Sequence, residues 1–366
     1  MNINLNKDVF LKPLQLINGV VERRQTLPIL ANVLIEANQG VLSLTATDLE
    51  VEIIIQLEVD SKVSGRITLP ARKLFDICRS LGDSADITIK VAEDKATIRS
   101  GRSRFVLTTL PADDFPDIGV MEDARSFTLK QGELKRLIDQ TSFAMAQQDV
   151  RYYLNGMLFE MGSDQLRTVA TDGHRLAMAE AAVNIGWNEK TQVIVPRKGI
   201  NELQRLLDDL DKDVNIELGI NHIRFSTEGL SFTSKLVDGR FPDYEHVVPK
   251  GGDKIVIVDR DALKQALVRA SILTNEKFRS ISVQVKSGSI VIRARNPEQE
   301  HAEEEVEVDY SGDEFEIGFN AAYVQDALGA MNEQQVQMVF TDPGSSCLLH
   351  GVANESSRYV VMPMRI

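Results

Sequence analysis

The sequence predicts an α+β protein built from three similar domains in tandem, and repeated residues at a constant spacing support this. The tripeptide Ala-Thr-Asp ends at Asp48 and again at Asp172, 124 residues later, and a weaker echo ends at Asn296 after another 124. Pro70-Ala71-Arg72-Lys73 is echoed by Pro196-Arg197-Lys198-Gly199, and Phe115-Pro116-Asp117 by Phe241-Pro242-Asp243. One third of 366 residues is 122, so the spacing accounts for the whole chain. Such a period indicates repeated domains, because solenoid and propeller repeats span roughly 20–50 residues.

We therefore expect one domain in each of the ranges 1–120, 126–247 and 248–366. At roughly 100–200 residues per domain, the chain length allows two to four of them. Gly, Pro and charged residues gather near 117–125 and 247–253, as is typical of domain boundaries.

Each domain is expected to begin with a helix, because apolar or small residues recur at i, i+3, i+4 and i+7 spacings. Asp8 is the expected cap of the first helix, which would put Pro13 near the first turn, where a missing N–H costs least. The three stripes are Phe10, Leu14 and Ile17; then Leu134, Leu137, Ile138 and Thr141; then Leu263, Ala266, Leu267 and Ala270.

Short strands and a second helix follow in each domain. In the first domain, strand-like residues cover 26–37 and 41–47, and apolar residues then alternate from Val51 to Leu57. More short strands are expected to close each domain, so that two helices lie on one face of antiparallel sheet. The second-helix stripes are Leu74, Ile77, Cys78 and Leu81; then Ile200, Leu203 and Leu207; then Val324, Leu328 and Met331.

The charge of the chain is unevenly distributed. A net charge of −13 argues by itself against a nucleic-acid binder, whose usual mark is a basic patch. The six expected helices nevertheless sum to +6, which leaves −19 for the remaining residues. This difference indicates either a mildly cationic helical face that holds phosphates loosely or simply solvated helix surface. The last helix, 320–331, carries only Asp326 and has a net charge of −1.

Composition places the chain among cytoplasmic globular proteins. The first residues, 1–6, lack the basic and apolar regions of a secretory signal, and no apolar run approaches the roughly 20 residues of a membrane span. Cys78 and Cys347 are far apart in sequence, so a disulfide framework is not expected. No cofactor is expected, and the remaining histidines show no metal-ligand spacing; these are His222, His246, His301 and His350.

The sequence contains no phosphate loop, dinucleotide-binding turn, zinc-protease motif or nucleophile elbow. The best candidate for chemistry is Thr171-Asp172-Gly173-His174-Arg175, in which Asp172 and His174 could serve as acid and base. The alternative is a strand-ending turn, because Asp-Gly favours tight turns and the counterpart at Asp48 lacks the histidine.

Three further segments are candidates for binding. The seven acids between Glu298 and Asp309 could hold a cation or face a basic partner such as Gly101-Arg102-Ser103-Arg104-Phe105, on a strand that could be a sheet edge. Arg151-Tyr152-Tyr153 could stack on nucleic acid or contribute to the core. The apolar end, 360–366, could be a locked strand or one wall of a docking groove.

Longer stretches of the chain closely resemble the bacterial β sliding clamp family, the processivity subunits of DNA polymerase III. The resemblance covers the whole chain and is carried by six stretches. They are Thr26-Leu27-Pro28-Ile29-Leu30, Gly101-Arg102-Ser103-Arg104-Phe105, Gln148-Asp149-Val150-Arg151-Tyr152-Tyr153-Leu154-Asn155-Gly156, Ala170-Thr171-Asp172-Gly173-His174-Arg175-Leu176, Ser234-Lys235-Leu236-Val237-Asp238-Gly239-Arg240-Phe241-Pro242-Asp243-Tyr244 and Met362-Pro363-Met364-Arg365.

The resemblance implies a non-catalytic clamp: a head-to-tail homodimer that closes into a ring, with helices lining a hole around double-stranded DNA. A ring that cannot come off needs little affinity, and its phosphate contacts carry no sequence information. A clamp loader ATPase would open it, which agrees with the missing phosphate loop. Short peptide motifs with Gln and Leu/Phe anchors would connect it to the polymerase III alpha subunit, other polymerases and repair proteins.

The resemblance also implies three sets of site residues. The DNA-facing positions are Arg24, Arg72, Gln148, Tyr152, Tyr153, Arg197 and Lys198. The peptide cleft is Leu154, Thr171, Gly173, His174, Arg175, Leu176, Pro242, Val247, Asn320, Tyr323, Val360, Met362, Pro363 and Met364. The dimer interface sets Lys73, Ile77, Phe105 and Leu107 against Ile272, Leu273, Glu298 and Glu300.

Three hypotheses therefore follow from the sequence: a DNA-encircling clamp, a hydrolase or lyase that uses Asp172 and His174, and a scaffold that binds only proteins. Alanine at His174 should impair partner docking in a clamp but turnover in an enzyme. A scaffold would show no retention on circular DNA.

Overall fold

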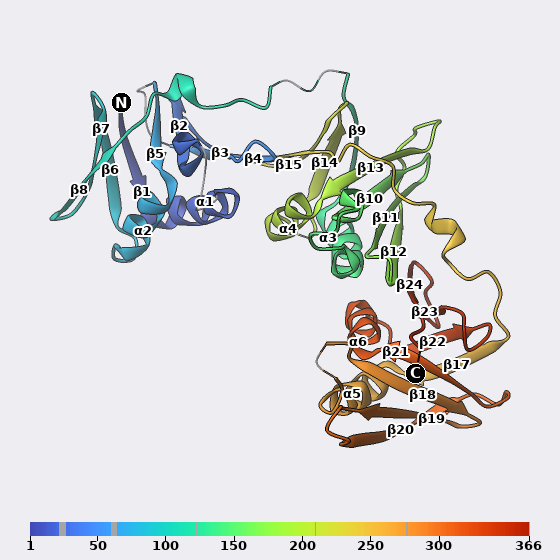
Figure 1. Ribbon diagram of the computed structural model, residues 1–366. Helices are drawn as coiled ribbons and strands as arrows, with labels where there is room; N and C mark the ends of the chain where they lie inside the picture. The colour runs from blue at the N-terminus through green and yellow to red at the C-terminus, as the bar shows by residue number, and fades with distance from the viewer. Residues whose placement is uncertain are drawn as a thin grey trace. The chain divides into compact units, whose positions relative to one another are not determined.

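A computed structural model describes residues 1–21, 27–59, 64–119, 121, 123–208, 210–275 and 277–365. Within these ranges the element order β-α-β-β-β-β-α-β-β-β occurs three times, once in each third of the chain (Figure 1). The α+β prediction is therefore confirmed. The repeat runs through all six α-helices of the described residues, two in each third.

The first set comprises β1 (Asn2–Asn6), α1 (Lys7–Val20), β2 (Asn32–Asn38), β3 (Val41–Thr47), β4 (Val51–Glu58), β5 (Gly65–Pro70), α2 (Ala71–Ser80), β6 (Asp86–Ala92), β7 (Lys95–Ser100) and β8 (Ser103–Thr108). The second comprises β9 (Arg125–Lys130), α3 (Gln131–Thr141), β10 (Gly156–Met161), β11 (Gln165–Thr171), β12 (Arg175–Ala182), β13 (Thr191–Pro196), α4 (Arg197–Leu206), β14 (Asp213–Leu218), β15 (His222–Thr227) and β16 (Leu230–Lys235). The third comprises β17 (Lys254–Asp259), α5 (Arg260–Ser271), β18 (Ser280–Lys286), β19 (Ser289–Arg295), β20 (His301–Asp309), β21 (Phe315–Asn320), α6 (Ala321–Ala330), β22 (Gln335–Phe340), β23 (Cys347–Gly351) and β24 (Ser357–Val361).

The chain forms two compact units. The first unit, Met1–Gly132 with Lys198–Leu236, holds an antiparallel sheet in the order β1-β6-β7-β8 and another in the order β5-β2-β3-β4-β16-β15-β14-β9. Helices α1 and α2 contact each other and lie against β2 to β5 (Figure 1). Phe10, Leu14 and Ile17 are buried on α1, as the sequence stripe predicts.

The second unit, Glu133–Arg197 with Val237–Ile366, is built on one twelve-stranded antiparallel arrangement. Its order is β13-β10-β11-β12-β24-β23-β22-β17-β20-β19-β18-β21. Helices α5 and α6 contact each other, and α5 packs against β19 and β20. Leu263, Ala266 and Leu267 form the buried face of α5, again as predicted.

Strand pairs join parts of the chain that are far apart in sequence. In the first unit β4 pairs with β16, with Ile53 opposite Phe232. In the second unit β12 pairs with β24, with Ala177 opposite Tyr359. In both pairs the fourth strand of one set meets the last strand of the next set. The last strand of the first set, β8, is an edge strand in the described residues.

Several local predictions for the first domain were wrong. The cap of α1 is Asn6, whose side chain accepts a hydrogen bond from the Asp8 N–H at 2.9 Å, while the Asp8 carboxylate accepts one from the Ser84 hydroxyl at 2.6 Å. Pro13 consequently lies inside the helix and not in its first turn.

The strand expected over 26–37 starts only at Asn32. Residues 28–31 form a short 3₁₀ turn, because Pro28 fixes the φ angle that starts such a turn. Thr26 lies outside the described residues. The expectation that each domain begins with a helix was also wrong, because a strand precedes the first helix of every set: β1, β9 and β17.

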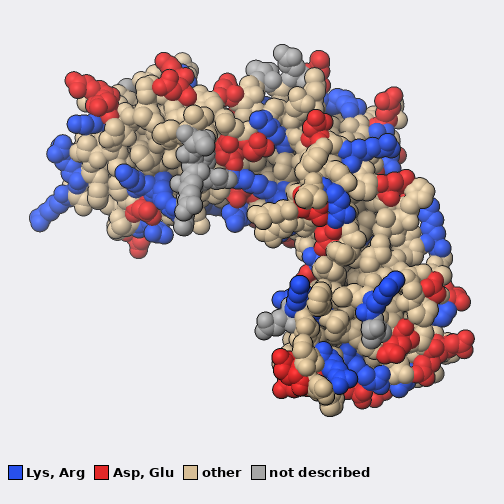
Figure 2. All heavy atoms as spheres, viewed as in Figure 1, with Lys and Arg blue, Asp and Glu red and all other residues tan. Residues whose placement is uncertain are grey.

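Charged side chains are interspersed over the face seen in Figure 2, with basic ones at the outer end of the lobe formed by β7 and β8. Arg102 and Arg104 are exposed there. Among the helices of the described residues, none has the length and apolar character that a membrane span requires.

Candidate functional site

The two Ala-Thr-Asp tripeptides form the same turn. The Thr47 hydroxyl donates to the Val51 carbonyl at 2.8 Å, and the Thr171 hydroxyl donates to the Arg175 carbonyl at 2.6 Å. Each aspartate accepts two backbone N–H groups of its turn, at 2.8–2.9 Å for Asp48 and at 2.9–3.1 Å for Asp172. The repeated motif therefore closes a hairpin, as the structural alternative from the sequence holds.

The Asp172 carboxylate is not paired with the His174 imidazole. One of its oxygens accepts the backbone N–H groups of the turn, and the other faces Arg175 Nε at 3.0 Å. The His174 ring instead stacks on Tyr323, with ring centroids 6.3 Å apart and an interplanar angle of 16°. This arrangement does not provide the acid–base pair that the enzymatic hypothesis requires.

Arg175 connects this turn to α6. Besides Asp172, its guanidinium reaches Asp326 on α6 at 2.5 Å and donates to the Phe143 carbonyl at 2.8 Å. It also lies 4.6 Å from the Tyr323 ring centroid and 5.2 Å from that of Phe143. With 13% of its side chain exposed, Arg175 supports Tyr323 more than it offers a free charge to a ligand.

The residues predicted for a peptide cleft come from five segments of the second unit. Leu176 and Val360 are buried in one apolar cluster, and Val247 packs on that cluster while still partly exposed. The backbone N–H of Met362 donates to the His174 carbonyl at 2.9 Å, which ties the end of the chain to the turn. Gly173, His174 and Pro242 are exposed; Thr171, Asn320, Tyr323, Met362, Pro363 and Met364 are half-buried; Leu154 is buried.

A buried polar network that sequence reasoning missed lies behind this cleft. Glu160 accepts hydrogen bonds from Gln192 at 2.6 Å, from the Tyr244 hydroxyl at 2.9 Å and from Arg167 at 3.2 Å, and Lys190 is 2.9 Å away. Burial alone would raise the pKa of Glu160, but its bonds to Gln192, Lys190 and Tyr244 hold that pKa below its ordinary value.

Tyr244 ties this network to the cleft. Burial raises the pKa of its phenol to about 12. It belongs to the same segment as Pro242 and Val247, so the network fixes one wall of the cleft. The Tyr244 hydroxyl bonds to Arg167 and Glu160, which lie 77 and 84 residues away in sequence, so no local pattern signals these contacts.

The DNA-facing predictions fall on both units. Arg24 lies outside the described residues. In the first unit Arg72 is exposed on α2, and Lys198 forms an ion pair with Asp48. The remaining positions, Gln148, Tyr152, Tyr153 and Arg197, belong to the second unit.

In the second unit Arg197 is engaged by backbone. Its guanidinium donates to the carbonyls of Met145 and Ala146 at 2.8 and 3.3 Å. It thereby supports the loop that carries Gln148, whose φ is +56°. Tyr152 is 57% exposed and meets Tyr153 edge-on at 5.8 Å. Tyr153 is half-buried, so of these two rings only that of Tyr152 is exposed beside this loop.

The predicted interface residues are largely accessible. Phe105 and Ile77 are half-buried, Leu107 is buried, and Lys73 is exposed. On the other side Ile272 is 75% exposed, Leu273 is half-buried, and Glu298 and Glu300 are exposed. In the acidic stretch Glu303 pairs with Arg293 and Glu304 with Arg269. The described residues contain no group of three or more side chains that could hold a metal ion.

Comparisons with known proteins bear on the whole chain. Residues 1–119, 128–243 and 245–365 match the models of the N-terminal, central and C-terminal domains of the DNA polymerase III beta subunit. The chain is 54% identical to the beta sliding clamp of Pseudomonas putida and 50% identical to that of Escherichia coli (strain K12), with 100% of each chain covered. It is similar to the crystal structure of the DNA polymerase III subunit beta from Pseudomonas aeruginosa, with a TM-score of 0.97, 54% identity and complete coverage of both chains. A solved Caulobacter crescentus beta sliding clamp matches with a TM-score of 0.94 and 41% identity, again over both full chains. The chain belongs to the DNA polymerase III beta subunit family, the three-domain beta sliding clamps that serve DNA replication as non-catalytic processivity factors.

Proposed function

We propose that two copies of this chain close head to tail into a ring around double-stranded DNA and hold the replication machinery on it. The observation that carries the proposal is the reuse of one strand pairing. The fourth strand of a domain meets the last strand of the next, in β4–β16 and in β12–β24. Among the described strands, β20 and β8 are left over from this scheme, and β20 pairs with β17 only at Val308 and Asp309, near its end. Pairing between β20 of one copy and β8 of a second copy would complete the series.

The repeated alanine supports one register for that pairing. Ala46 lies opposite Ile53, which in turn lies opposite Phe232. Ala170 lies opposite Ala177, which in turn lies opposite Tyr359. In the third domain Ala294 lies opposite Ala302. The aromatic residue is the third residue of its strand in β16 and β24, and the third residue of β8 is Phe105.

Phe105 of one copy would therefore lie opposite Ala302 of the other. In the same antiparallel register, Arg104 would lie opposite Glu303, and Leu107 opposite Glu300. A basic strand facing an acidic one supports pairing of unlike edges and disfavours pairing of two identical ones. The side chains proposed around this ladder are Lys73, Ile77, Phe105 and Leu107 on one copy and Ile272, Leu273, Glu298 and Glu300 on the other.

We propose that DNA is held without reading its sequence, by Arg24, Arg72, Gln148, Tyr152, Tyr153, Arg197 and Lys198. Lys198 and Arg197 are already bound within the protein, which supports a weak grip, because a cation shared with a carboxylate or carbonyl neutralises a phosphate less fully. Retention would then come from enclosure. The proposed domains are 1–120, 126–247 and 248–366, and the proposed location is the cytoplasm, where these partners act.

The peptide cleft is proposed as the shared docking site for the polymerase III alpha subunit, other polymerases, repair proteins and the clamp loader. Its exposed and half-buried members surround a buried floor of Leu176 and Val360. Met362 and Met364 adapt to different anchors, which suits a site used by several partners.

The test combines particle mass with retention on DNA. The protein should have twice the chain mass, stay on loaded circular DNA, and leave when that DNA is linearised. Arg104→Glu and Glu303→Arg should each weaken the dimer by roughly tenfold or more, because like charges would then meet, and together they should restore it. Lys95→Glu on β7 is the matched control and should leave the dimer unchanged. A monomeric protein, or one held equally well on linear DNA, contradicts the proposal.

A further inference from the structure

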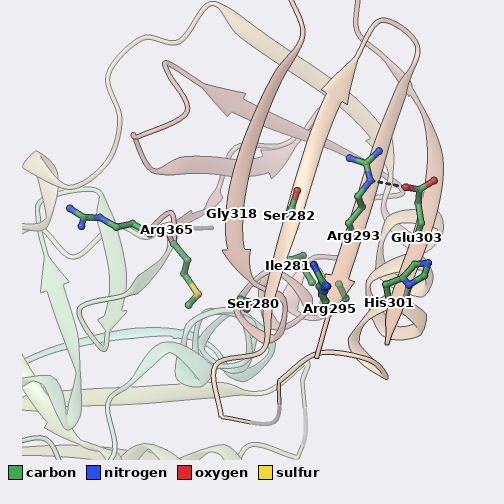
Figure 3. A pocket seen from close by; sticks show the side chains of 12 residues that line it. Ser280, Ile281, Ser282, Arg293, Arg295, His301, Glu303, Gly318 and Arg365 are labelled. Carbon is green, nitrogen blue, oxygen red and sulfur yellow. Dashed lines mark hydrogen bonds and ion pairs between the residues drawn. The ribbon is translucent and has the colours of Figure 1, made fainter. Parts of the chain in front are cut away.

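A hollow of about 300 Å³ opens on the outer face of the third-domain sheet, apart from the turn and cluster described above (Figure 3). It exists because the residues on this face are small where the hollow lies. Gly318 of β21 lies opposite Ser282 of β18, and Met364 closes one side through a bridge to Gly318. Ile281, Ala294 and Ala302 also border the hollow, but they alternate with its other residues along their strands and belong to the opposite face, where Ile281 and Ala294 are buried.

The other side of the hollow is cationic. Arg293 and Arg295 come from β19, and His301 from β20 lies directly opposite Arg295 in the ladder. Figure 3 shows these three side chains together on neighbouring strands, while the Arg365 guanidinium is turned away from them. A concentration of basic groups is notable in a chain with a net charge of −13.

The carboxylates around the hollow are already engaged. Glu303 pairs with Arg293 at 2.6 Å, Glu316 accepts the Ser282 hydroxyl, and Glu300 accepts the Asn296 amide at 2.6 Å. Across the described residues, the Arg295 and His301 side chains have no hydrogen bond or ion pair. Both are exposed and lie directly opposite each other, so one acceptor group between them would reach both donors.

We propose that this hollow binds the carboxylate side chain of an acidic peptide segment that continues from the peptide cleft. Arg295 and His301 would donate to the carboxylate, and the Met364 side chain would contact the methylene groups of a glutamate. Continuity supports a peptide as the occupant, since Met364 belongs to both sites and Asn320 of the cleft lies opposite Ser280 of the hollow. The inference thus rests on the proposed cleft. In the proposed dimer, Val106 of the second copy would lie opposite His301 at the rim of the hollow, and Arg295 on β19 would stay one strand away from the added strand.

The experiment compares three peptides and three proteins. The first peptide carries the Gln and Leu/Phe anchors alone. The second adds two glutamates before the anchors, and the third adds two glutamates after them. Their affinities are measured by fluorescence anisotropy with the unmodified dimer, Arg295→Gln, and Lys286→Gln. Lys286 is a matched control, because it lies on the same sheet at the far end of β18, outside the hollow.

In the unmodified protein and in Lys286→Gln, the glutamates of one of the two extended peptides should tighten binding about fivefold. A gain of this size corresponds to a modest charge-assisted contact. This gain should vanish in Arg295→Gln and at high salt, because screening weakens it. An equal gain in Arg295→Gln, or no gain in any version, would overturn the inference. Failure of the anchor peptide itself would instead count against the proposed cleft.

A methyl spectrum of methionine-labelled protein separates a peptide from a free anion. The acidic peptide should shift the Met364 resonance in the unmodified protein and not in Arg295→Gln. A shift caused by inorganic phosphate alone, without any gain from the glutamates, would mean that the hollow takes a small anion and would refute the peptide assignment.

Discussion

Replacing Arg175 with methionine should destabilise the second unit far more than the loss of an exposed ion pair would. The change keeps a long side chain beside Tyr323 and Phe143 but removes the charge. It breaks the contacts with Asp172 at 3.0 Å and Asp326 at 2.5 Å, and the bond to the Phe143 carbonyl at 2.8 Å.

The expected loss in the free energy of unfolding depends on how deeply each partner of Arg175 is buried. Asp172 is 17% exposed and would lose its charged partner, which costs about 1.5 kcal/mol. Asp326 is 47% exposed, so solvent screening limits that loss to about 0.5 kcal/mol. The carbonyl bond and the two ring contacts add about 1 kcal/mol. The total of about 3 kcal/mol corresponds to roughly 6–12 °C in melting temperature for a unit of this size.

Calorimetry on Arg175→Met, with Lys12→Met as a control, tests this reasoning. Lys12 pairs with Asp208 at 2.5 Å, a shorter contact than most, but the two side chains are 70% and 57% exposed. The control should therefore melt within about 2 °C of the unmodified protein. If the melting temperatures of both variants fall by the same small amount, burial does not determine how much these ion pairs stabilise the protein, and the estimate for Arg175 is wrong.

Three further outcomes are expected. Burial raises the pKa of Tyr244 in the folded state to about 12, above the ordinary value near 10, so its stabilising effect is complete below pH 10 and is lost as the pH rises to 12. Between pH 10 and 12 the free energy of unfolding of Tyr244→Phe should therefore fall by up to about 2 kcal/mol less than that of the unmodified protein. Leu49→Gly should stabilise the first unit by about 1 kcal/mol in urea unfolding, because Leu49 has a φ of +75° that glycine adopts freely. The reverse change at the equivalent position, Gly173→Leu, should cost at least about 1 kcal/mol, since φ is +89° and a Cβ would meet Arg151 Nη1 at 3.0 Å. Unchanged stability at either position would contradict the strain argument.

The sequence predicted the elements whose cause is local. The helix stripes at Leu74 and Cys78 or at Leu263 and Leu267 are buried, because helical periodicity depends on near neighbours. The two Ala-Thr-Asp turns were recognisable as structural for the same reason. The cap of α1 was misassigned between Asn6 and Asp8, since both residue types accept backbone N–H groups.

Features that depend on distant pairing could not be predicted in this way. No pattern around β4 signals that it pairs with β16, and no local signal connects Glu160 with Tyr244. The peptide cleft residues were named from family resemblance alone, and the physical role of Arg175 emerged only from its contacts with α6. Side chains joined across long separations in sequence are set by the fold as a whole.

The pairing of β4 with β16 also affects how the chain is made. About 180 residues separate the ends of these two strands. At a synthesis rate of roughly 5–20 residues per second, a nascent β4 waits on the order of ten to thirty seconds for its neighbour to leave the ribosome. During that delay its open backbone groups are a template for the wrong strand, so the interval between translation of β4 and β16 is the period in which this polypeptide most needs chaperone protection.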